Sequence, residues 1–80
     1  MAKVIERSNG YEFVGLSAIG MRLVNEFQRQ DPLLCVPSSE PEYRFIRRGS
    51  PQQNLLLEKL VADVIARDPD IKPPKFKTRT

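Results

Sequence analysis

The side chains that carry most enzyme chemistry are scarce in this sequence. It has no histidine and one cysteine, Cys35. These counts exclude an intrachain disulfide, a zinc site built from Cys and His, and a nucleophile activated by histidine. Cys35 stands between Leu34 and Val36, which favours a small buried apolar side chain over a reactive thiolate. We therefore expect a protein that is not an enzyme and has no cofactor and no metal site.

Aromatic and basic side chains alternate in residues 42–48, which read Glu-Tyr-Arg-Phe-Ile-Arg-Arg and predict a strand. The candidate binding residues in it are Arg44, Arg47 and Arg48. Arginines that meet phosphates beside aromatics that stack on bases are typical of a nucleic-acid-binding strand. The alternative is an edge strand, with Tyr43 and Phe45 in the core and arginines that prevent edge-to-edge aggregation.

The net charge is concentrated at the C-terminus. The chain has 13 Lys and Arg against 10 Asp and Glu, but residues 1–69 hold nine of each. We expect residues 1–69 to form a small globular domain and residues 70–80 to form a basic, extended, mobile tail. Such a tail either contacts a phosphate backbone or an acidic protein groove, or only solvates the terminus. Its candidate contact residues are Lys72, Lys75, Phe76, Lys77 and Arg79.

Residues 50–67 carry the clearest helix pattern. Ser50 is a natural N-cap, Pro51 suits the first helical position, and Gln53 completes a capping box. Apolar residues recur at helical spacing from Leu57 onward, which predicts one buried face.

Leu55 and Leu56 widen this apolar surface beyond one stripe. They are candidate interface residues for a second copy or another protein. The alternative is a helix that is buried on two sides.

Residues 1–30 allow two interpretations, and we favour the first. In it, Asn9-Gly10 is the two-residue turn of a hairpin that pairs Arg7 with Glu12, followed by a helix over residues 18–30. In the second, one long helix covers residues 10–29. Two glycines inside that helix count against it, because each costs about 1 kcal/mol relative to alanine.

Serine and proline residues mark the ends of the remaining elements. Ser17 is expected to cap the helix over residues 18–30, and Asp31-Pro32 ends it. The proline-rich residues 31–41 predict a loop. The sum is a ββαβα arrangement of the α+β class, with a small antiparallel sheet covered on one face by two helices. The alternative is a mostly α fold with a long N-terminal helix.

Several short segments resemble the omega subunit of bacterial RNA polymerase. They are Tyr11-Glu12-Phe13-Val14 with Leu16 and Ala18, the later Asp31-Pro32-Leu33, and the start Met1-Ala2-Lys3-Val4. The resemblance covers about 33 residues. It implies a long helix near the N-terminus and a role as an accessory subunit of a larger assembly.

These observations favour a small non-enzymatic accessory protein that docks onto a larger protein or nucleoprotein assembly, or that forms a homodimer. Direct binding of nucleic acid through the arginine-rich strand and the tail is the alternative. No segment has the apolar length of a membrane span or of a signal peptide, so we expect no membrane contact and a cytoplasmic protein.

Overall fold

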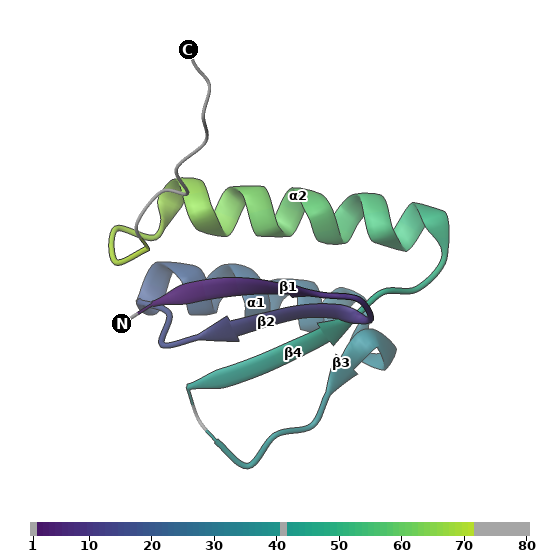
Figure 1. The fold of residues 1–80 in the computed structure, drawn as a ribbon, viewed down its shortest axis with the longest axis horizontal. Coiled ribbons are helices and arrows are strands. Elements are labelled where there is room, and N and C mark those ends of the chain that lie inside the picture. The colour runs from purple at the N-terminus through teal and green to yellow at the C-terminus, as the bar shows by residue number, and fades with distance from the viewer. Residues whose placement is uncertain (1, 41, 72–80) are drawn as a thin grey trace.

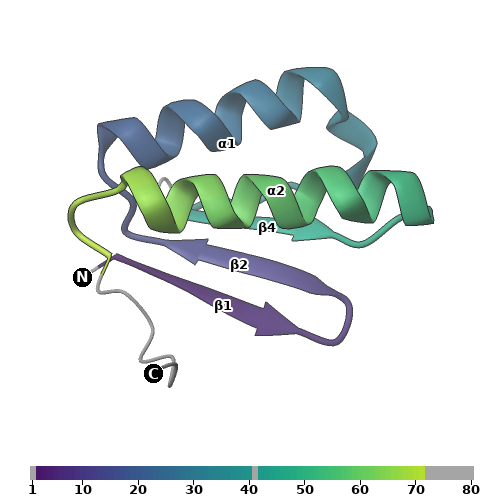
Figure 2. The ribbon, with the colours of Figure 1, turned by 90° about the horizontal axis from the view of Figure 1, so that it is seen from above.

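The computed structural model describes residues 2–40 and 42–71 and confirms the predicted α+β fold. The elements are β1 (Lys3–Arg7), β2 (Gly10–Val14), α1 (Ala18–Gln30), the short 3-10 helix η1 (Pro32–Leu34), β3 (Cys35–Val36), β4 (Tyr43–Arg47) and α2 (Pro51–Arg67). The strands form one antiparallel sheet in the order β1-β2-β4-β3. Both helices pack on the same side of this sheet (Figures 1 and 2).

The hairpin forms, but its turn lies one residue earlier than predicted. Arg7 pairs with Gly10 rather than with Glu12, so the turn residues are Ser8 and Asn9. The predicted pairing is therefore wrong by two positions on β2. The Asn-Gly preference applies to a turn in which both central residues have positive φ, whereas among the described residues only glycines have positive φ, so this preference did not fix the register.

Gly10 belongs to β2, where the strand approaches β4 closely. A Cβ atom on Gly10 would lie 2.3 Å from the carbonyl oxygen of Ile46. No side chain fits there, which explains a glycine inside a strand. Because residues 10–14 form β2, the long helix over residues 10–29 is wrong.

Asp68 caps α1 from the far end of the chain. Ser17 is the N-cap residue of α1, as predicted, but its side chain makes no capping hydrogen bond. Instead, the Ser17 N–H donates to Asp68 Oδ2 at 2.9 Å. Gly20 leaves space for this carboxylate, since a Cβ atom there would lie 2.5 Å from the same oxygen. The end of α2 is thereby fixed to the start of α1.

The start of α2 confirms the predicted capping box. The Gln53 N–H donates to Ser50 Oγ at 3.3 Å, and the Ser50 N–H donates to Gln53 Oε1 at 2.8 Å. Pro51 occupies the first helical position, where its missing N–H is not needed.

The predicted loop over residues 31–41 contains regular structure. The helix α1 ends at Gln30 as expected, but η1 and β3 follow, and Cys35 pairs with Ile46 of β4. Leu34 is buried, whereas Leu33 is 82 % exposed. A two-residue strand leaves no periodicity in the sequence, so the pattern could not predict β3.

The core lies between the sheet and the two helices. Its largest fully buried side chains are Phe13, Val24, Ile46, Leu57 and Val64. Tyr43 and Phe45 are not in this core, because successive residues of β4 point to opposite faces and Ile46 takes the inward position. The expectation that these two aromatics are core residues is wrong.

The packed region extends to Ile71, two residues beyond the expected boundary at residue 69. Ile71 is buried and forms a parallel bridge with Ala2. The rest of the predicted tail, residues 72–80, lies outside the described part of the chain. Within residues 2–40 and 42–71, neither helix has the length and apolar character to cross a membrane.

Candidate docking surface

One face of the sheet is not covered by either helix, and we call it the open sheet face. Residues that are paired across neighbouring strands point to the same face. The register puts Lys3 beside Val14 and Val14 beside Tyr43 on this side. The remaining residues of this face form two further rows of paired positions. The open sheet face comprises Lys3, Ile5, Arg7, Gly10, Glu12, Val14, Val36, Tyr43, Phe45 and Arg47.

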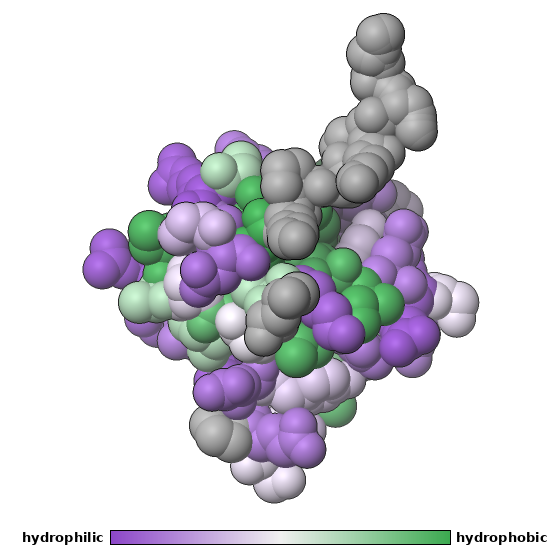
Figure 3. All heavy atoms as spheres, turned by 60° about the vertical axis from the view of Figure 1, so that its left-hand side comes forward, coloured by the Kyte–Doolittle hydropathy of each residue, from purple (hydrophilic) through white to green (hydrophobic). Residues whose placement is uncertain are grey.

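Apolar side chains cluster on the open sheet face on both sides of Glu12, which stands between Ile5 and Phe45 in the register. Ile5, Val14, Tyr43 and Phe45 are half-buried, and Val36 is 38 % exposed. Figure 3, turned toward the end of the molecule where α1 begins and α2 ends, shows apolar surface interspersed with hydrophilic side chains. Protein-binding patches usually have an apolar centre and a polar rim, and this patch differs in that one carboxylate, that of Glu12, lies inside it.

The charged residues of this face are mostly engaged locally. Arg7 Nε lies 3.2 Å from Glu12 Oε2, and Arg47 donates to the carbonyl oxygen of Leu33 at 2.9 Å. Partial burial and the nearby Glu12 carboxylate raise the pKa of Tyr43, so its phenol stays neutral near pH 7. The face therefore offers neutral aromatic side chains beside the Arg7–Glu12 ion pair, with Arg47 at one margin.

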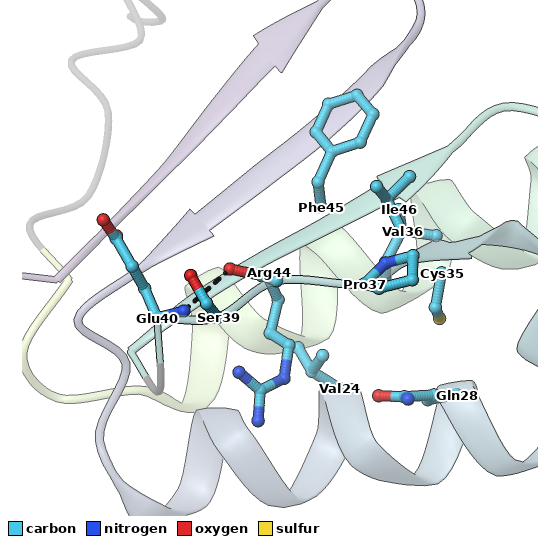
Figure 4. Close-up of a pocket in the computed structure, with 11 residues that line it drawn as sticks. Val24, Gln28, Cys35, Val36, Pro37, Ser39, Glu40, Arg44, Phe45 and Ile46 are labelled. Carbon is cyan, nitrogen blue, oxygen red and sulfur yellow. Dashed lines mark hydrogen bonds between the residues drawn. The ribbon is translucent and has the colours of Figure 1, made fainter.

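The structure separates the three arginines of the predicted binding strand. Arg47 is exposed on the open sheet face, whereas Arg44 points to the other side, toward α1 (Figure 4). Arg44 donates to the carbonyl oxygen of its neighbour Tyr43 at 3.0 Å. Phe45 points away from α1, so the aromatic face and Arg44 lie on opposite sides (Figure 4).

Arg48 holds the hairpin to the end of β4. Its guanidinium donates to the carbonyl oxygens of Arg7 and Ser8 and lies 2.9 Å from Glu6 Oε2. It also stacks over the Tyr11 ring, with 4.9 Å to the ring centroid. These contacts use most donors of the guanidinium for the fold itself.

The other predicted contact residues lie elsewhere. Leu55 and Leu56 are 68 % and 58 % exposed, so both lie outside the core. Adjacent residues of a helix point about 100° apart, so the two side chains do not form one patch. Leu56 borders a groove between the helices, together with Leu60 of the same helix and Phe27 of α1. The predicted tail residues Lys72, Lys75, Phe76, Lys77 and Arg79 lie outside the described residues.

A second hollow, of about 500 Å³, lies between α1 and the segment that follows β3 (Figure 4). Gln28, Cys35 and Arg44 are among its lining residues. Burial, and to a lesser extent the charge of Asp31, raises the pKa of the Cys35 thiol. These two effects outweigh that of Arg44, whose positive charge lowers the pKa. A thiol shifted this way is a poor nucleophile at neutral pH. No cluster of potential metal ligands occurs in the described residues.

The sequence interpretation missed the contribution of β1 to the open sheet face. Lys3, Ile5 and Arg7 share a face with the aromatic residues of β4 because β2 pairs with both strands and continues the sheet between them. Their alternation with Val4 and Glu6 is a strand signal in the sequence. Placing them beside β4 requires the strand order, which this pattern does not contain.

Comparison with known proteins does not assign the chain to a family or a fold group. No family model matches the chain, and neither the curated proteins nor the solved structures contain a match to it.

Proposed function

We propose that this protein is a small non-enzymatic docking module that binds a segment of a larger protein on its open sheet face. The observation that carries the proposal is the cluster of half-buried apolar side chains around Glu12 on this face, which no helix of the described structure covers. They are Ile5, Val14, Tyr43 and Phe45. The absence of histidine from the sequence also favours binding over catalysis.

The size of the face indicates the kind of partner. Four strands span three spacings of about 4.8 Å, and five residues extend about 17 Å, which gives a face of roughly 240 Å². A standard protein interface buries about 800 Å² on each partner. The open sheet face therefore suits one extended or helical segment of a partner better than a broad globular surface.

A pair of matched variants tests this proposal. Val36→Glu introduces a charge on the open sheet face, and Ile19→Glu makes the same kind of change on α1, where the side chain is 47 % exposed. We expect proximity labelling in cells to give a reproducible set of neighbours for the wild type and for Ile19→Glu, and to lose it for Val36→Glu. Equal loss in both variants, or in neither, would contradict docking through this face.

Direct binding of nucleic acid is the second candidate, because Lys3, Arg7 and Arg47 share the open sheet face with two aromatic residues. Three phosphate contacts predict that the logarithm of the affinity for single-stranded nucleic acid falls with a slope of about −2 against the logarithm of salt concentration. Fluorescence anisotropy with labelled RNA, single-stranded DNA and duplex DNA measures this slope. An affinity that does not change with salt would rule out this candidate.

The long N-terminal helix implied by the resemblance to the omega subunit is not formed, because β2 occupies residues 10–14. That resemblance therefore adds no support to the choice of partner. Docking onto a nucleoprotein assembly stays within the proposal, with the open sheet face as the contact.

A further inference from the structure

The strand β1 lies at one edge of the sheet. It comes first in the order β1-β2-β4-β3, and Figure 2 shows it at the border of the molecule opposite α1. Within residues 2–40 and 42–71, one isolated bridge occupies this edge, between Ala2 and Ile71, just before β1 begins. In the described structure the edge is therefore open from Lys3 to Arg7. The strand at the opposite edge, β3, has only two residues and offers a shorter surface for pairing.

The hydrogen bonds next to β2 show which of its backbone groups face β4. The Gly15 N–H donates to the carbonyl oxygen of Glu42 at 2.9 Å, and the Arg48 N–H donates to that of Asn9 at 3.0 Å. Residues of an antiparallel strand alternate between those that bond to one neighbour and those that bond to the other. The odd-numbered residues from 9 to 15 therefore bond to β4, and the even-numbered residues of β2 bond to β1.

This alternation determines the outward groups of β1. The even-numbered residues of β2 are paired with Lys3, Ile5 and Arg7, so these three residues use their N–H and C=O groups within the hairpin. Val4 and Glu6 direct theirs away from β2, which gives two donors and two acceptors along the edge. A row of backbone groups of this kind is a template for pairing with a strand of another chain.

The side chains at this edge select an acidic partner. Lys3, Ile5 and Arg7 lie on the open sheet face, and an added strand would place one side chain beside each of them. Lys3 is exposed and takes part in no ion pair among the described residues, whereas Arg7 is paired with Glu12 at 3.2 Å. Charged side chains at an edge oppose unselective pairing. The matching strand therefore carries an acidic residue beside Lys3 and an apolar residue beside Ile5.

A second copy of this chain does not match the same edge. Two copies related by a two-fold axis would pair it antiparallel, with Val4 or Glu6 of one chain facing Val4 or Glu6 of the other. Val4 facing Glu6 puts Lys3 beside an arginine of the copy, and Glu6 facing Glu6 puts two carboxylates together, both of which are destabilising. Val4 facing Val4 extends the pairing to Ala2, where Ile71 already occupies the edge. The occupant is therefore a segment of a different protein.

We propose that β1 binds an extended segment of another protein as a further strand of the sheet. The outward backbone groups of Val4 and Glu6 hold the segment, with an acidic side chain beside Lys3 and an apolar one beside Ile5. In strand addition the backbone hydrogen bonds give affinity, and alternate side chains give specificity. This inference rests on the proposed docking function and names its binding mode and the chemistry of the segment.

Hydrogen exchange with a synthetic peptide tests the added strand directly. The probe is the blocked peptide Glu-Thr-Val-Val-Glu, which in antiparallel orientation places its middle valine beside Ile5 and its last glutamate beside Lys3. In the free chain we expect the amides of Val4 and Glu6 to exchange rapidly and that of Ile5 slowly. With saturating peptide, the first two should exchange about tenfold more slowly. Protection of Val4 and Glu6 in the free chain, or no change with the peptide, would overturn the proposal.

Two substitutions at one position separate the backbone from the side chain. Glu6→Ala and Glu6→Pro both remove the carboxylate that lies 2.9 Å from Arg48 Nη2, but only proline also removes the outward N–H. Proline is tolerated at an edge where the N–H faces solvent, and slow exchange at Ile5 confirms that the hairpin is intact. We expect Glu6→Pro to bind the peptide about tenfold more weakly than Glu6→Ala does. Equal affinities would refute pairing through this edge.

A charge reversal tests the side-chain match without a change in the backbone. The second probe is Lys-Thr-Val-Val-Lys, which the wild type should bind several-fold more weakly than the acidic peptide. Lys3→Glu should bind the acidic peptide more weakly than the wild type does and the basic peptide more tightly. An unchanged preference in Lys3→Glu would contradict the assigned contact.

The proximity-labelling assay separates the failure of this inference from the failure of the docking function. We expect Glu6→Pro to lose the same neighbours as Val36→Glu, and Glu6→Ala to keep them. Loss in Val36→Glu with retention in Glu6→Pro would refute strand addition and leave docking on the open sheet face intact. Retention in both variants would refute both proposals.

Discussion

Replacement of Asp68 by alanine is expected to be the most damaging single change outside the apolar core. The Asp68 side chain is 2 % exposed and accepts two backbone hydrogen bonds, from the N–H of Ser17 and the N–H of Asp70, each at 2.9 Å. Alanine removes both acceptors. The Ser17 N–H at the start of α1 and the Asp70 N–H after α2 then lose their partners in a region with little access to water.

The size of the effect follows from these two bonds. A hydrogen bond to a charged group contributes about 1.5–3 kcal/mol, so the loss of two gives roughly 3 kcal/mol at the low end. A domain of this size has a free energy of unfolding of about 4–12 kcal/mol. Asp68→Ala therefore removes a quarter or more of the stability. In a small domain this lowers Tm by about 12 °C or more.

The pH dependence of stability reports on the same carboxylate. Burial raises the pKa of Asp68, but the hydrogen bonds from the backbone N–H groups of Asp70 and Ser17 lower it by more, so the folded pKa lies below the ordinary 3.8. The charged form thus stabilises the fold above pH 4, and this contribution disappears as the pH falls through the folded pKa. Asp68→Asn should lose stability at pH 7 and depend less on pH below 4 than the wild type does.

Urea unfolding followed by circular dichroism measures these differences, with Asp70→Ala as the control for an exposed acid nearby. Gly20→Ala adds a further check, because its Cβ atom would meet Asp68 Oδ2 at 2.5 Å. We expect Gly20→Ala to destabilise the wild type and to cost less in the Asp68→Ala background. The capping role is refuted if Asp68→Ala destabilises the protein no more than Asp70→Ala does.

Three further predictions concern the strands and the cysteine. Gly10→Ala places a Cβ atom 2.3 Å from the Ile46 carbonyl oxygen and should lower the free energy of unfolding by about 2–3 kcal/mol in the same urea assay. Arg48→Ala should lower it by about 1–2 kcal/mol, whereas Arg47→Ala should change it by less than about 0.5 kcal/mol, because Arg48 anchors the hairpin and Arg47 is exposed. Iodoacetamide should modify Cys35 several-fold more slowly in the folded chain than in urea at pH 8, because its raised pKa and partial burial reduce the reactive thiolate; equal rates would contradict this.

The helices were predictable because their signals are local. The capping box at Ser50 and the proline after Asp31 act on neighbouring backbone groups, so their effect is contained in a few consecutive residues. The choice of a hairpin over a long helix also followed from local propensity, through the two glycines that a helix over residues 10–29 would contain.

The errors concern contacts between residues that are distant in sequence. The hairpin register depends on the fit of Gly10 against Ile46, 36 positions later, which no turn preference contains. The cap of α1 comes from Asp68, 51 residues after Ser17. A serine before a helix predicts a cap made by its own side chain, and only the packed structure shows that a distant carboxylate accepts from the Ser17 N–H.

Part of the candidate site could be predicted from the sequence, because the alternation of side chains along a strand is a local signal. Alternation along β4 correctly put Tyr43 and Phe45 on one face and Ile46 on the other, since the side-chain direction in a strand has a period of two residues. It did not indicate which of the two faces the helices cover. That choice follows from volume and hydrophobicity summed over the whole sheet, because Ile46 shares its side with Phe13, which is fully buried under the helices.

This choice of face changes the functional meaning of the aromatic strand. Had the helices covered Tyr43 and Phe45, the arginines at positions 44 and 48 would form the exposed surface and a phosphate ligand would be favoured. With the helices on the other side, the exposed surface is aromatic and aliphatic, and Arg48 serves the hairpin. Arg7 on this face is paired with Glu12, and Arg47 donates to the carbonyl oxygen of Leu33, so the face gains more from the burial of a partner's apolar side chains than from neutralising phosphates. The register of β4 therefore favours a protein segment over a nucleic acid as the ligand of this face.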